Sequence, residues 1–233
     1  MSLVELKEVS KVYKVGDVSF KALDQVNLSI EEGKFVVILG PSGAGKSTLL
    51  NLLGGLDSPS SGNIIVDHKD ISTLSNNELA EYRASKVGFV FQFYNLIPTL
   101  TVEENVALVK EITKNALDPK EILAKVGLKD HLKKFPVELS GGEQQRVSIA
   151  RAVSKNPKIL LCDEPTGALD SNTGVLVLKL LLDLTREYGK TIIIVTHNQN
   201  IAKMADVVVR VKNGKIKDIE NQLHPSSIEE VDW

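Results

Sequence analysis

The sequence predicts an α/β fold: a parallel β-sheet core, preceded by antiparallel strands and interrupted by an inserted group of helices. Two observations predict it. Short, uninterrupted apolar runs, typical of parallel strands covered on both faces, recur along the chain, and helical segments separate them. Of the 233 residues, 42% are hydrophobic and 25% are charged. These are ordinary values for a globular protein, and they exclude a disordered, collagen-like or membrane-embedded chain.

The expected strands follow from the spacing of apolar residues. The first thirty residues alternate apolar and polar positions, as half-buried antiparallel strands do. From Phe35 onward the alternation gives way to continuous apolar runs. Five such runs are the expected parallel strands, at residues 35–39, 87–91, 159–162, 192–195 and 207–209. Helical patterns are expected between them, at residues 47–53, 76–84, 143–154 and 175–188.

The strand–helix alternation stops between Thr101 and Ser154. Helices are expected there at residues 102–113, 119–126 and 143–154, with no good strand among them. We therefore interpret residues 95–154 as a helical subdomain inserted into one domain that spans residues 1–220. Residues 221–233 contain a proline, two serines and three acidic residues. This composition predicts a flexible tail.

Charge and cysteine content narrow the classes of partner and compartment. Lys and Arg number 28 against 30 Asp and Glu, a formal net charge of −2. The balance gives no general attraction to nucleic acid, so no nucleic-acid partner is expected. A single cysteine, Cys162, favours a reducing compartment. Charged residues within positions 1–9 argue against a signal peptide, and no apolar run is long enough to cross a bilayer. We expect a cytoplasmic chain.

A phosphate-binding pattern lies between the first parallel strand and the first helix. It fits G-x-x-x-x-G-K-[ST] and comprises Gly40, Pro41, Ser42, Gly43, Ala44, Gly45, Lys46, Ser47 and Thr48. The glycines let successive N–H groups point at phosphate oxygens, and the helix start adds positive potential. Lys46 supplies a cation for the β- and γ-phosphates, and the Ser47 hydroxyl suits Mg²⁺. An ordinary glycine-rich turn is the alternative, which the flanking strand and helix disfavour.

Other strands end in polar residues suited to a triphosphate, its metal ion or its attacking water. The strand at 159–162 leads into Asp163, a candidate Mg²⁺ ligand, and Glu164, a candidate base for water. Gln92 and His197 follow two further strands. A glutamine can position water or bond to a metal-bound oxygen, and a histidine can donate to a terminal phosphate. Alone each is usually structural, but ligands of open α/β sheets bind at these strand ends.

Residues 139–146 open a helix. Ser140 with Glu143 three positions later forms a capping box, so a well-made helix start is the plain interpretation. The same N–H groups, with Gly141 and Gly142 allowing close approach, also suit a phosphate. The spacing does not say whose phosphate that would be.

Together these motifs resemble the ATPases of ABC transporters, over about residues 2–218. Residues 40–47 resemble the Walker A loop, Gln92 the Q-loop, 139–145 the signature motif, 159–163 the Walker B strand, Glu164 the catalytic glutamate, and His197 the switch histidine. The resemblance implies a P-loop NTPase (RecA-like) core that binds ATP, with Mg²⁺ held by Ser47, Gln92 and Asp163. It implies a D-loop role for Asp170 and adenine stacking for Tyr13. Residues 49–57, 89–92 and 95–101 look like the MacB/LolD branch, which also includes FtsE.

The resemblance also implies partners. In this family two ATPase domains pack head to tail, so residues Ser140 to Glu143 of one copy would complete the nucleotide site of a second copy. A separate multi-spanning permease would supply the membrane part, with an extracytoplasmic adaptor as a further possible partner. The expected function is therefore ATP hydrolysis that powers export or extraction, at the inner face of the plasma membrane. An FtsE-like regulatory role without transport is the alternative that stays open.

Two other classes fit less well. A DNA-repair ATPase with the same signature would need a long coiled-coil or zinc-binding insertion, and the sequence has neither. A translation-factor ATPase of this superfamily would carry two copies of the motifs in one chain, and this chain carries one.

Overall fold

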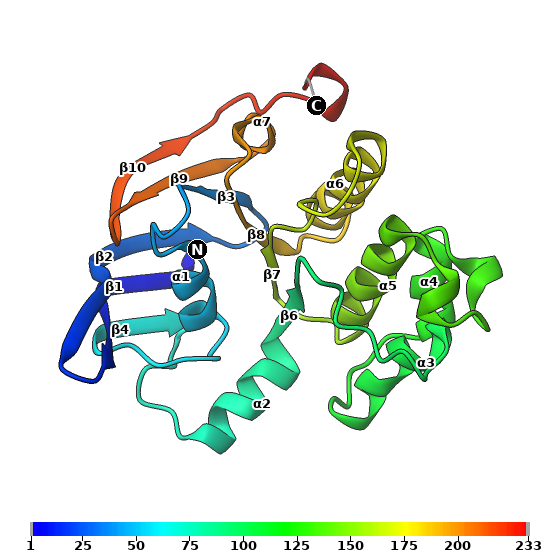
Figure 1. Ribbon diagram of the computed structural model, residues 1–233, viewed down its shortest axis with the longest axis horizontal. Helices are drawn as coiled ribbons and strands as arrows, with labels where there is room; N and C mark the ends of the chain where they lie inside the picture. The colour runs from blue at the N-terminus through cyan, green and yellow to red at the C-terminus, as the bar shows by residue number, and fades with distance from the viewer. Residues whose placement is uncertain (1, 232–233) are drawn as a thin grey trace.

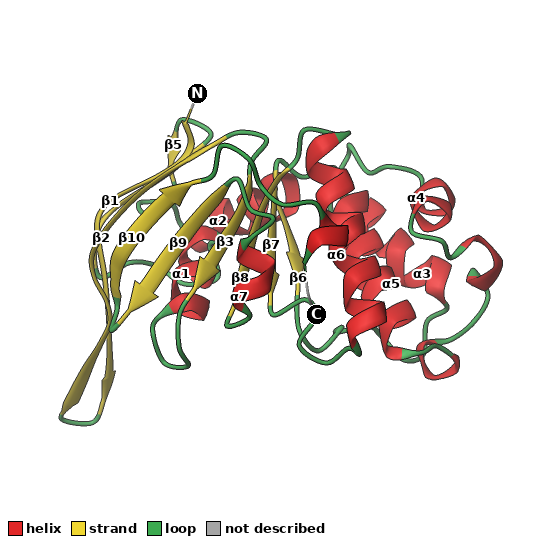
Figure 2. Cartoon of the chain, turned by 90° about the horizontal axis from the view of Figure 1, so that it is seen from above, coloured by secondary structure: helices red, strands yellow, loops and turns green. Residues whose placement is uncertain are grey.

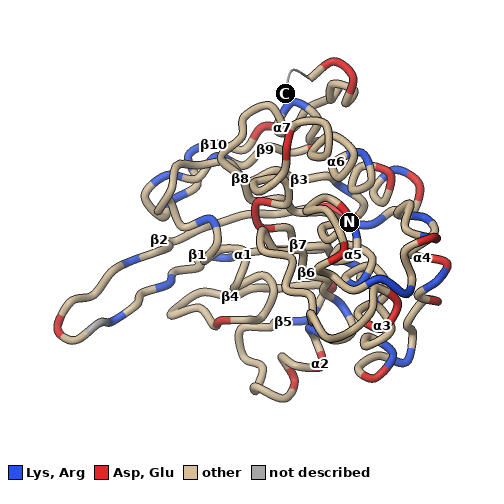
Figure 3. The backbone as a smooth tube through the Cα atoms, turned by 45° about the vertical axis from the view of Figure 1, so that its right-hand side comes forward, with Lys and Arg blue, Asp and Glu red and all other residues tan. Residues whose placement is uncertain are grey.

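The computed structural model describes residues 2–231 and contains two β-sheets beside a group of helices (Figure 1). The first sheet is antiparallel, with strand order β2-β1-β4-β5. Strands β1 (Ser2–Val15) and β2 (Val18–Glu31) form a long hairpin, whose tip extends away from the rest of the molecule in Figure 3. The predicted N-terminal antiparallel strands are confirmed. Two short strands that were not predicted, β4 (Ser61–Val66) and β5 (Lys69–Asp70), complete this sheet.

The second sheet has the order β10-β9-β3-β8-β7-β6. Neighbouring strands from β9 to β6 pair in parallel, so all five predicted parallel strands are confirmed. They are β3 (Phe35–Leu39), β6 (Val87–Val90), β7 (Ile159–Asp163), β8 (Thr191–Thr196) and β9 (Val207–Lys212). Strand β10 (Lys215–Asn221), which the sequence did not predict, adds an antiparallel edge. Because β3, β8, β7 and β6 are consecutive in this order, the four strand ends that carry the predicted chemistry are adjacent.

Helices of the core connect these strands, and a separate group of helices lies to one side of the sheets (Figure 2). The core helices are α1 (Lys46–Leu53), α2 (Asn76–Lys86), α6 (Ser171–Arg186) and α7 (Gln199–Ala202). The separate group is α3 (Val102–Ala107), α4 (Pro119–Lys125) and α5 (Gly141–Ser154), with 3₁₀ turns at Leu108–Glu111, Lys129–His131 and Pro136–Glu138. The predicted helical insertion is confirmed. Within residues 2–231, every helix is too short or too polar to cross a bilayer.

The largest differences from the predicted helix bounds occur in two helices. The helix expected at residues 102–113 ends as an α-helix at Ala107 and continues as a 3₁₀ turn, a tightening that is common at helix ends. Helix α6 begins at Ser171, four residues before the predicted start. The Asp170 side chain accepts a hydrogen bond from the Thr173 backbone N–H at 3.1 Å and caps this polar first turn. Apolar periodicity alone does not detect such a turn.

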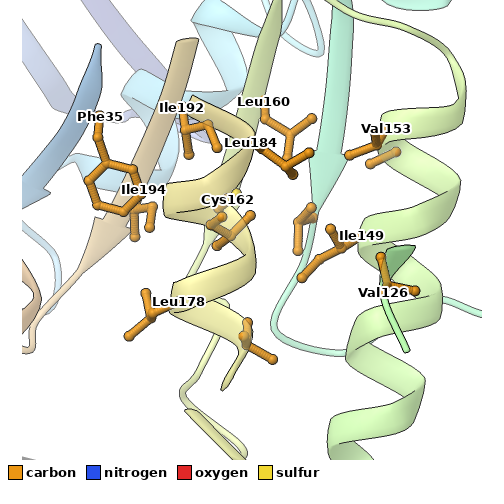
Figure 4. Close-up of a cluster of buried hydrophobic side chains, with 14 of the residues drawn as sticks. Phe35, Val126, Ile149, Val153, Leu160, Cys162, Leu178, Leu184, Ile192 and Ile194 are labelled. Atoms are coloured by element: carbon orange, nitrogen blue, oxygen red, sulfur yellow. The ribbon is translucent and has the colours of Figure 1, made fainter. Parts of the chain in front are cut away.

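The larger hydrophobic core lies between the parallel sheet and the helices α5 and α6 (Figure 4). Phe35, Leu160 and Ile192 contribute from the sheet, Leu178 comes from α6 and Ile149 from α5, and all five are 1% exposed or less. Full burial of one such side chain stabilises the fold by about 1.5–3 kcal/mol. This packing holds both helices against the strands whose ends form the site described below.

The expected flexible tail is corrected by the structure. Asn221 is still part of strand β10. The backbone N–H of Gln222 donates to the Asp206 carbonyl at 2.9 Å, and that of Ser226 donates to the Lys203 carbonyl at 2.9 Å. Ile228 and Val231 are buried in the larger core. Composition suggested disorder, but two apolar residues suffice to anchor the segment beside α6. The expectation for residues 232–233 lies outside the described residues.

Candidate nucleotide-binding site

The loop between β3 and α1 is shaped by glycine. Gly45 is the N-cap of α1 with φ = +104°, a conformation that side chains disfavour, and no side chain caps this helix. A Cβ atom on Gly45 would lie 2.5 Å from the Ala22 carbonyl oxygen of β2. The loop therefore rests directly on the backbone of the first sheet. The first N–H groups of α1 have no side-chain acceptor, which leaves them available to an anion.

Lys46 points back into this loop. Its ammonium donates to the carbonyl oxygens of Gly40 at 2.8 Å and Pro41 at 3.1 Å, and the residue is only 9% exposed. These contacts hold the cation at the concave side of the loop, where the sequence predicts phosphate oxygens. Gly40 and Pro41 thus contribute by fixing the lysine, a role that the sequence pattern did not reveal.

The predicted metal ligands Ser47 and Asp163 lie together. The Ser47 hydroxyl is 3.5 Å from Asp163 Oδ1. Burial raises the pKa of Asp163, and the neighbouring Glu164 carboxylate adds to this effect. A cation beside Asp163 would offset that cost, so one hydroxyl and one carboxylate fit Mg²⁺, which usually takes few protein ligands together with phosphate oxygens and water. Residues 2–231 contain no cluster of three His, Cys, Asp or Glu side chains able to hold a metal alone.

Glu164 and His197 are in direct contact. Glu164 Oε1 accepts from the His197 backbone N–H at 3.0 Å and lies 2.8 Å from the ring Nδ1. Glu164 Oε2 accepts from the Thr196 hydroxyl at 2.8 Å. The sequence predicted Glu164 and His197 as separate contributors, and their pairing is a result of the parallel register of β7 and β8. Thr196 was not predicted from the sequence, because it looked like an ordinary buried strand residue.

Most of the residues described above share one cavity of about 700 Å³. Its lining includes most of the predicted residues, namely Ser42, Gly43, Ala44, Gly45, Lys46, Ser47, Thr48, Gln92, Asp163, Glu164 and His197, together with Phe20 and Ala22 from β2. Eight predicted residues are not among the described residues that line it, namely Tyr13, Gly40, Pro41, Ser140, Gly141, Gly142, Glu143 and Asp170.

The hairpin β1–β2 brings two aromatic residues to this end of the molecule. Tyr13 lies opposite Phe20 in the strand register. The Tyr13 hydroxyl donates to Asp57 at 2.8 Å, and the Lys11 ammonium lies 4.9 Å from the centre of the tyrosine ring. Phe20, which the sequence reasoning missed, lines the cavity. Its signal was weak because it occupies one apolar position in an alternating strand. Adenine stacking on Tyr13 stays a prediction.

At the start of α5, Ser140 and Glu143 form hydrogen bonds with each other. The predicted capping box is confirmed: Ser140 Oγ accepts from the Glu143 N–H, and Glu143 Oε2 accepts from the Ser140 N–H at 2.7 Å and from its hydroxyl at 2.7 Å. A Cβ atom on Gly142 would lie 2.0 Å from Thr173 Cγ2, so α5 and α6 approach closely there. Gly141 similarly faces the Tyr94 hydroxyl. The glycines thus have a packing role besides any role in binding.

These features define a class. A parallel α/β sheet carries a glycine-rich loop with a buried lysine, a serine–aspartate pair suited to Mg²⁺ and a glutamate that directly follows this aspartate at the end of β7, and these groups line one cavity. This is the architecture of a P-loop nucleoside triphosphatase.

Comparison with known proteins gives the family. Residues 23–167 match the family model described as ABC transporter. A Mycoplasma pneumoniae protein described as an ABC transporter ATP-binding protein is 43% identical over 234 residues, covering 99% of this chain and 50% of that protein. The macrolide export ATP-binding/permease protein MacB of Mannheimia succiniciproducens is 45% identical over 230 residues, covering 97% of this chain and 36% of MacB. The chain belongs to the ABC transporter ATP-binding family, and it spans half the length of the Mycoplasma relative.

A solved structure agrees with this assignment. The ATP-binding cassette MJ0796 of Methanocaldococcus jannaschii, determined as a dimer in a post-hydrolysis state with ADP and Pi, superposes with a TM-score of 0.86 at 44% identity. The match covers 94% of this chain and 98% of that one. The chain is therefore an ABC-type ATPase domain with the fold of this cassette.

Proposed function

We propose that this chain binds and hydrolyses Mg²⁺-ATP as the ATPase subunit of an ABC transporter, working as a head-to-tail dimer. One observation carries the proposal: six predicted side chains from four strand ends converge on one cavity. They are Lys46, Ser47, Asp163, Glu164, Gln92 and His197. Lys46 would bind the β- and γ-phosphates, Ser47 and Asp163 with Gln92 would hold Mg²⁺, and Glu164 would orient water and accept its proton. Mg²⁺ supplies charge neutralisation for the transferred phosphoryl group.

The second copy is proposed because part of the predicted site lies outside this cavity. Residues Ser140 to Glu143 and Asp170 do not line the cavity that holds Lys46. If they act on a nucleotide, that nucleotide belongs to another chain. The dimer described for MJ0796 supports this arrangement. ATP would then join two copies, since each would contribute donors to one γ-phosphate.

The Glu164→Gln variant tests this mechanism. It keeps the size of the side chain and removes the charge that activates water, so ATP should bind and persist. We expect this variant to be dimeric in ATP and monomeric in ADP by light scattering over a range of protein concentrations. Adding Ser140→Arg, which places bulk where phosphate would dock, should abolish the dimer without loss of ATP binding. A Glu164→Gln protein that stays monomeric in ATP contradicts the shared site.

The relative MacB supports a membrane partner for this chain. MacB is by name an ATP-binding and permease protein, and we propose that a multi-spanning permease, with an extracytoplasmic adaptor as a further partner, works with this chain at the inner face of the plasma membrane. Gln92 borders the helical subdomain, so Gln92→Ala should impair transport more than ATP binding. Co-purification with a cell-division membrane protein, and no permease, would favour the FtsE-like role.

A further inference from the structure

We propose that Thr196 is a positioning residue for hydrolysis: its hydroxyl fixes the Glu164 carboxylate and selects the oxygen that remains free to meet water. The inference rests on the proposed function, in which Glu164 is the base. The contacts that carry it all lie at the ends of β7 and β8, and three donors from β8 and the residue after it reach this one carboxylate.

The direction of the threonine hydrogen bond is fixed by its neighbours. The Asn198 backbone N–H donates to Thr196 Oγ1 at 3.1 Å. The hydroxyl proton is therefore directed to Glu164 Oε2, 2.8 Å away, since an ionised carboxylate only accepts. Asn198 is itself fixed, because its side-chain oxygen accepts from the Asn200 N–H at 2.9 Å and caps α7. The threonine thus links a helix start to the proposed base.

The donors are unequally divided between the two carboxylate oxygens. Each oxygen has about two acceptor sites. Oε1 meets two donors, the backbone N–H and the ring nitrogen of His197, whereas Oε2 meets one, the Thr196 hydroxyl. One acceptor site on Oε2 is left over. The hydroxyl occupies the other site on this same oxygen, and so sets the direction in which the free site points.

Thr196 and His197, the two residues whose side chains contact the Glu164 carboxylate, differ in burial. Thr196 is 1% exposed, and its β-branched side chain has few rotamers. The His197 side chain is 74% exposed, so its ring is free to leave the carboxylate, as a contact with a terminal phosphate would require. The Glu164 backbone is also fixed, with its N–H donating to the Val195 carbonyl at 2.9 Å. Thr196 therefore stays on the carboxylate when the histidine does not.

The test compares variants that differ in this one hydroxyl. Thr196→Val has nearly the same shape and removes the donor, and Thr196→Ala removes it with less bulk in case valine disturbs the strand. Thr196→Ser keeps the donor. Thr191→Val is the matched control, because Thr191 is equally buried at the other end of β8 and its hydroxyl oxygen accepts from the Gly33 N–H at 2.9 Å. The full chain is assayed for ATPase activity, and its affinity for a fluorescent ATP analogue is measured.

We expect Thr196→Val and Thr196→Ala to lower kcat about tenfold, while KM and analogue affinity stay within twofold of the wild type. Thr196→Ser should recover kcat to within threefold, and Thr191→Val should keep it. In a Glu164→Gln background, Thr196→Val should cause no further loss, because the two residues act as one unit. The ATP-loaded dimer should persist longer in Thr196→Val than in the wild type.

Several results would overturn the inference. They are an unchanged kcat in both Thr196→Val and Thr196→Ala, equal losses in the valine and serine variants, an equal loss in Thr191→Val, or a loss of analogue affinity that matches the loss of kcat. A wild-type chain that binds no ATP contradicts the proposed function itself, which keeps the two failures distinct.

Discussion

The starts of helices α1 and α5 are the two places where we propose that this chain contacts phosphate, and their local structures differ. Helix α1 has Gly45 as its N-cap, with no side-chain cap and no acidic residue in its first turn. Helix α5 has Ser140 as its N-cap in a complete capping box, in which the Glu143 carboxylate accepts hydrogen bonds from both the N–H and the hydroxyl of Ser140. One helix start is open to an anion, and the other is closed by its own side chains.

The difference teaches how a shared site can be made dependent on assembly. No side chain occupies the first N–H groups of α1, and the buried Lys46 lies beside them, so this helix start is open to a phosphate. At α5 the hydrogen bonds from Ser140 hold the pKa of Glu143 below its usual range, so a negative charge stays beside the helix start. A phosphate must compete with that charge. We infer that α5 binds phosphate weakly by itself and needs the nucleotide already fixed on another copy.

The largest expected effect comes from removing the lysine at the start of α1. Lys46→Ala removes the cation that the loop carbonyls hold, and should lower ATP affinity about 100-fold or more and abolish hydrolysis. Isothermal titration with ATP and a phosphate-release assay measure both. Lys120→Ala, an exposed lysine of α4, is the control and should bind like the wild type. Normal ATPase activity in a folded Lys46→Ala protein would overturn the P-loop assignment.

Gly142→Ala changes the packing at the start of α5 and leaves the charge there unchanged. The Cβ atom of Gly142→Ala would meet Thr173 Cγ2 at 2.0 Å, so we expect a loss of about 2 kcal/mol in the free energy of unfolding. Thr173→Ser removes that methyl group and should cost less alone. The double variant should recover most of the loss, as seen by urea unfolding. Additive effects of the two changes would show that this contact is not the cause.

Removing the Ser140 cap tests whether the capping box of α5 contributes to the stability of the fold or to ATP binding. Ser140→Ala loses the side-chain acceptor of the capping box and should lower the free energy of unfolding by about 1 kcal/mol. ATP affinity of the single chain should be unchanged, because Ser140 does not line the cavity of its own chain. Thermal unfolding and analogue titration are the measurements. Weaker ATP binding by monomeric Ser140→Ala would mean that the two helix starts act in one chain.

The smallest effect concerns the other end of α5. Lys155 donates to the Arg83 carbonyl at 2.6 Å, and burial, with Arg83 and Arg151 nearby, lowers its pKa to about 8. Below pH 8 the lysine is charged in both folded and unfolded chains, so the cost of burying the charge is fully present. As pH rises from 8 toward 10.4 the folded chain loses this proton first, and stability rises.

This effect is visible as a difference between variants. The stability of Lys155→Met relative to the wild type should fall by about 1 kcal/mol between pH 7.5 and 10, a value reduced for partial solvent contact. Lys158→Met is the control: the Asp67 carboxylate raises the pKa of Lys158, so the corresponding difference should stay flat over this range. A flat difference for Lys155→Met in urea unfolding at several pH values would show that Lys155 is not desolvated.

Much of this architecture could be read from the sequence because its signals are local. Apolar runs located all five parallel strands, and the capping box at Ser140 and Glu143 was recognised from two residues three positions apart. The phosphate loop needed only its own nine residues and their neighbours. Each of these features depends on chain segments that are close in sequence, so residue type and spacing determine them.

What only the tertiary structure decided depends on contacts between distant segments. The pairing of Glu164 with Thr196 and His197 follows from the register of β7 against β8, and Phe20 enters the cavity because the first sheet packs against the loop at Gly45. Ile228 and Val231 anchor the last residues although their surroundings are polar, because the sheet and α6 offer them an apolar surface. Burial depends on which surface a residue meets, and local sequence does not contain that information.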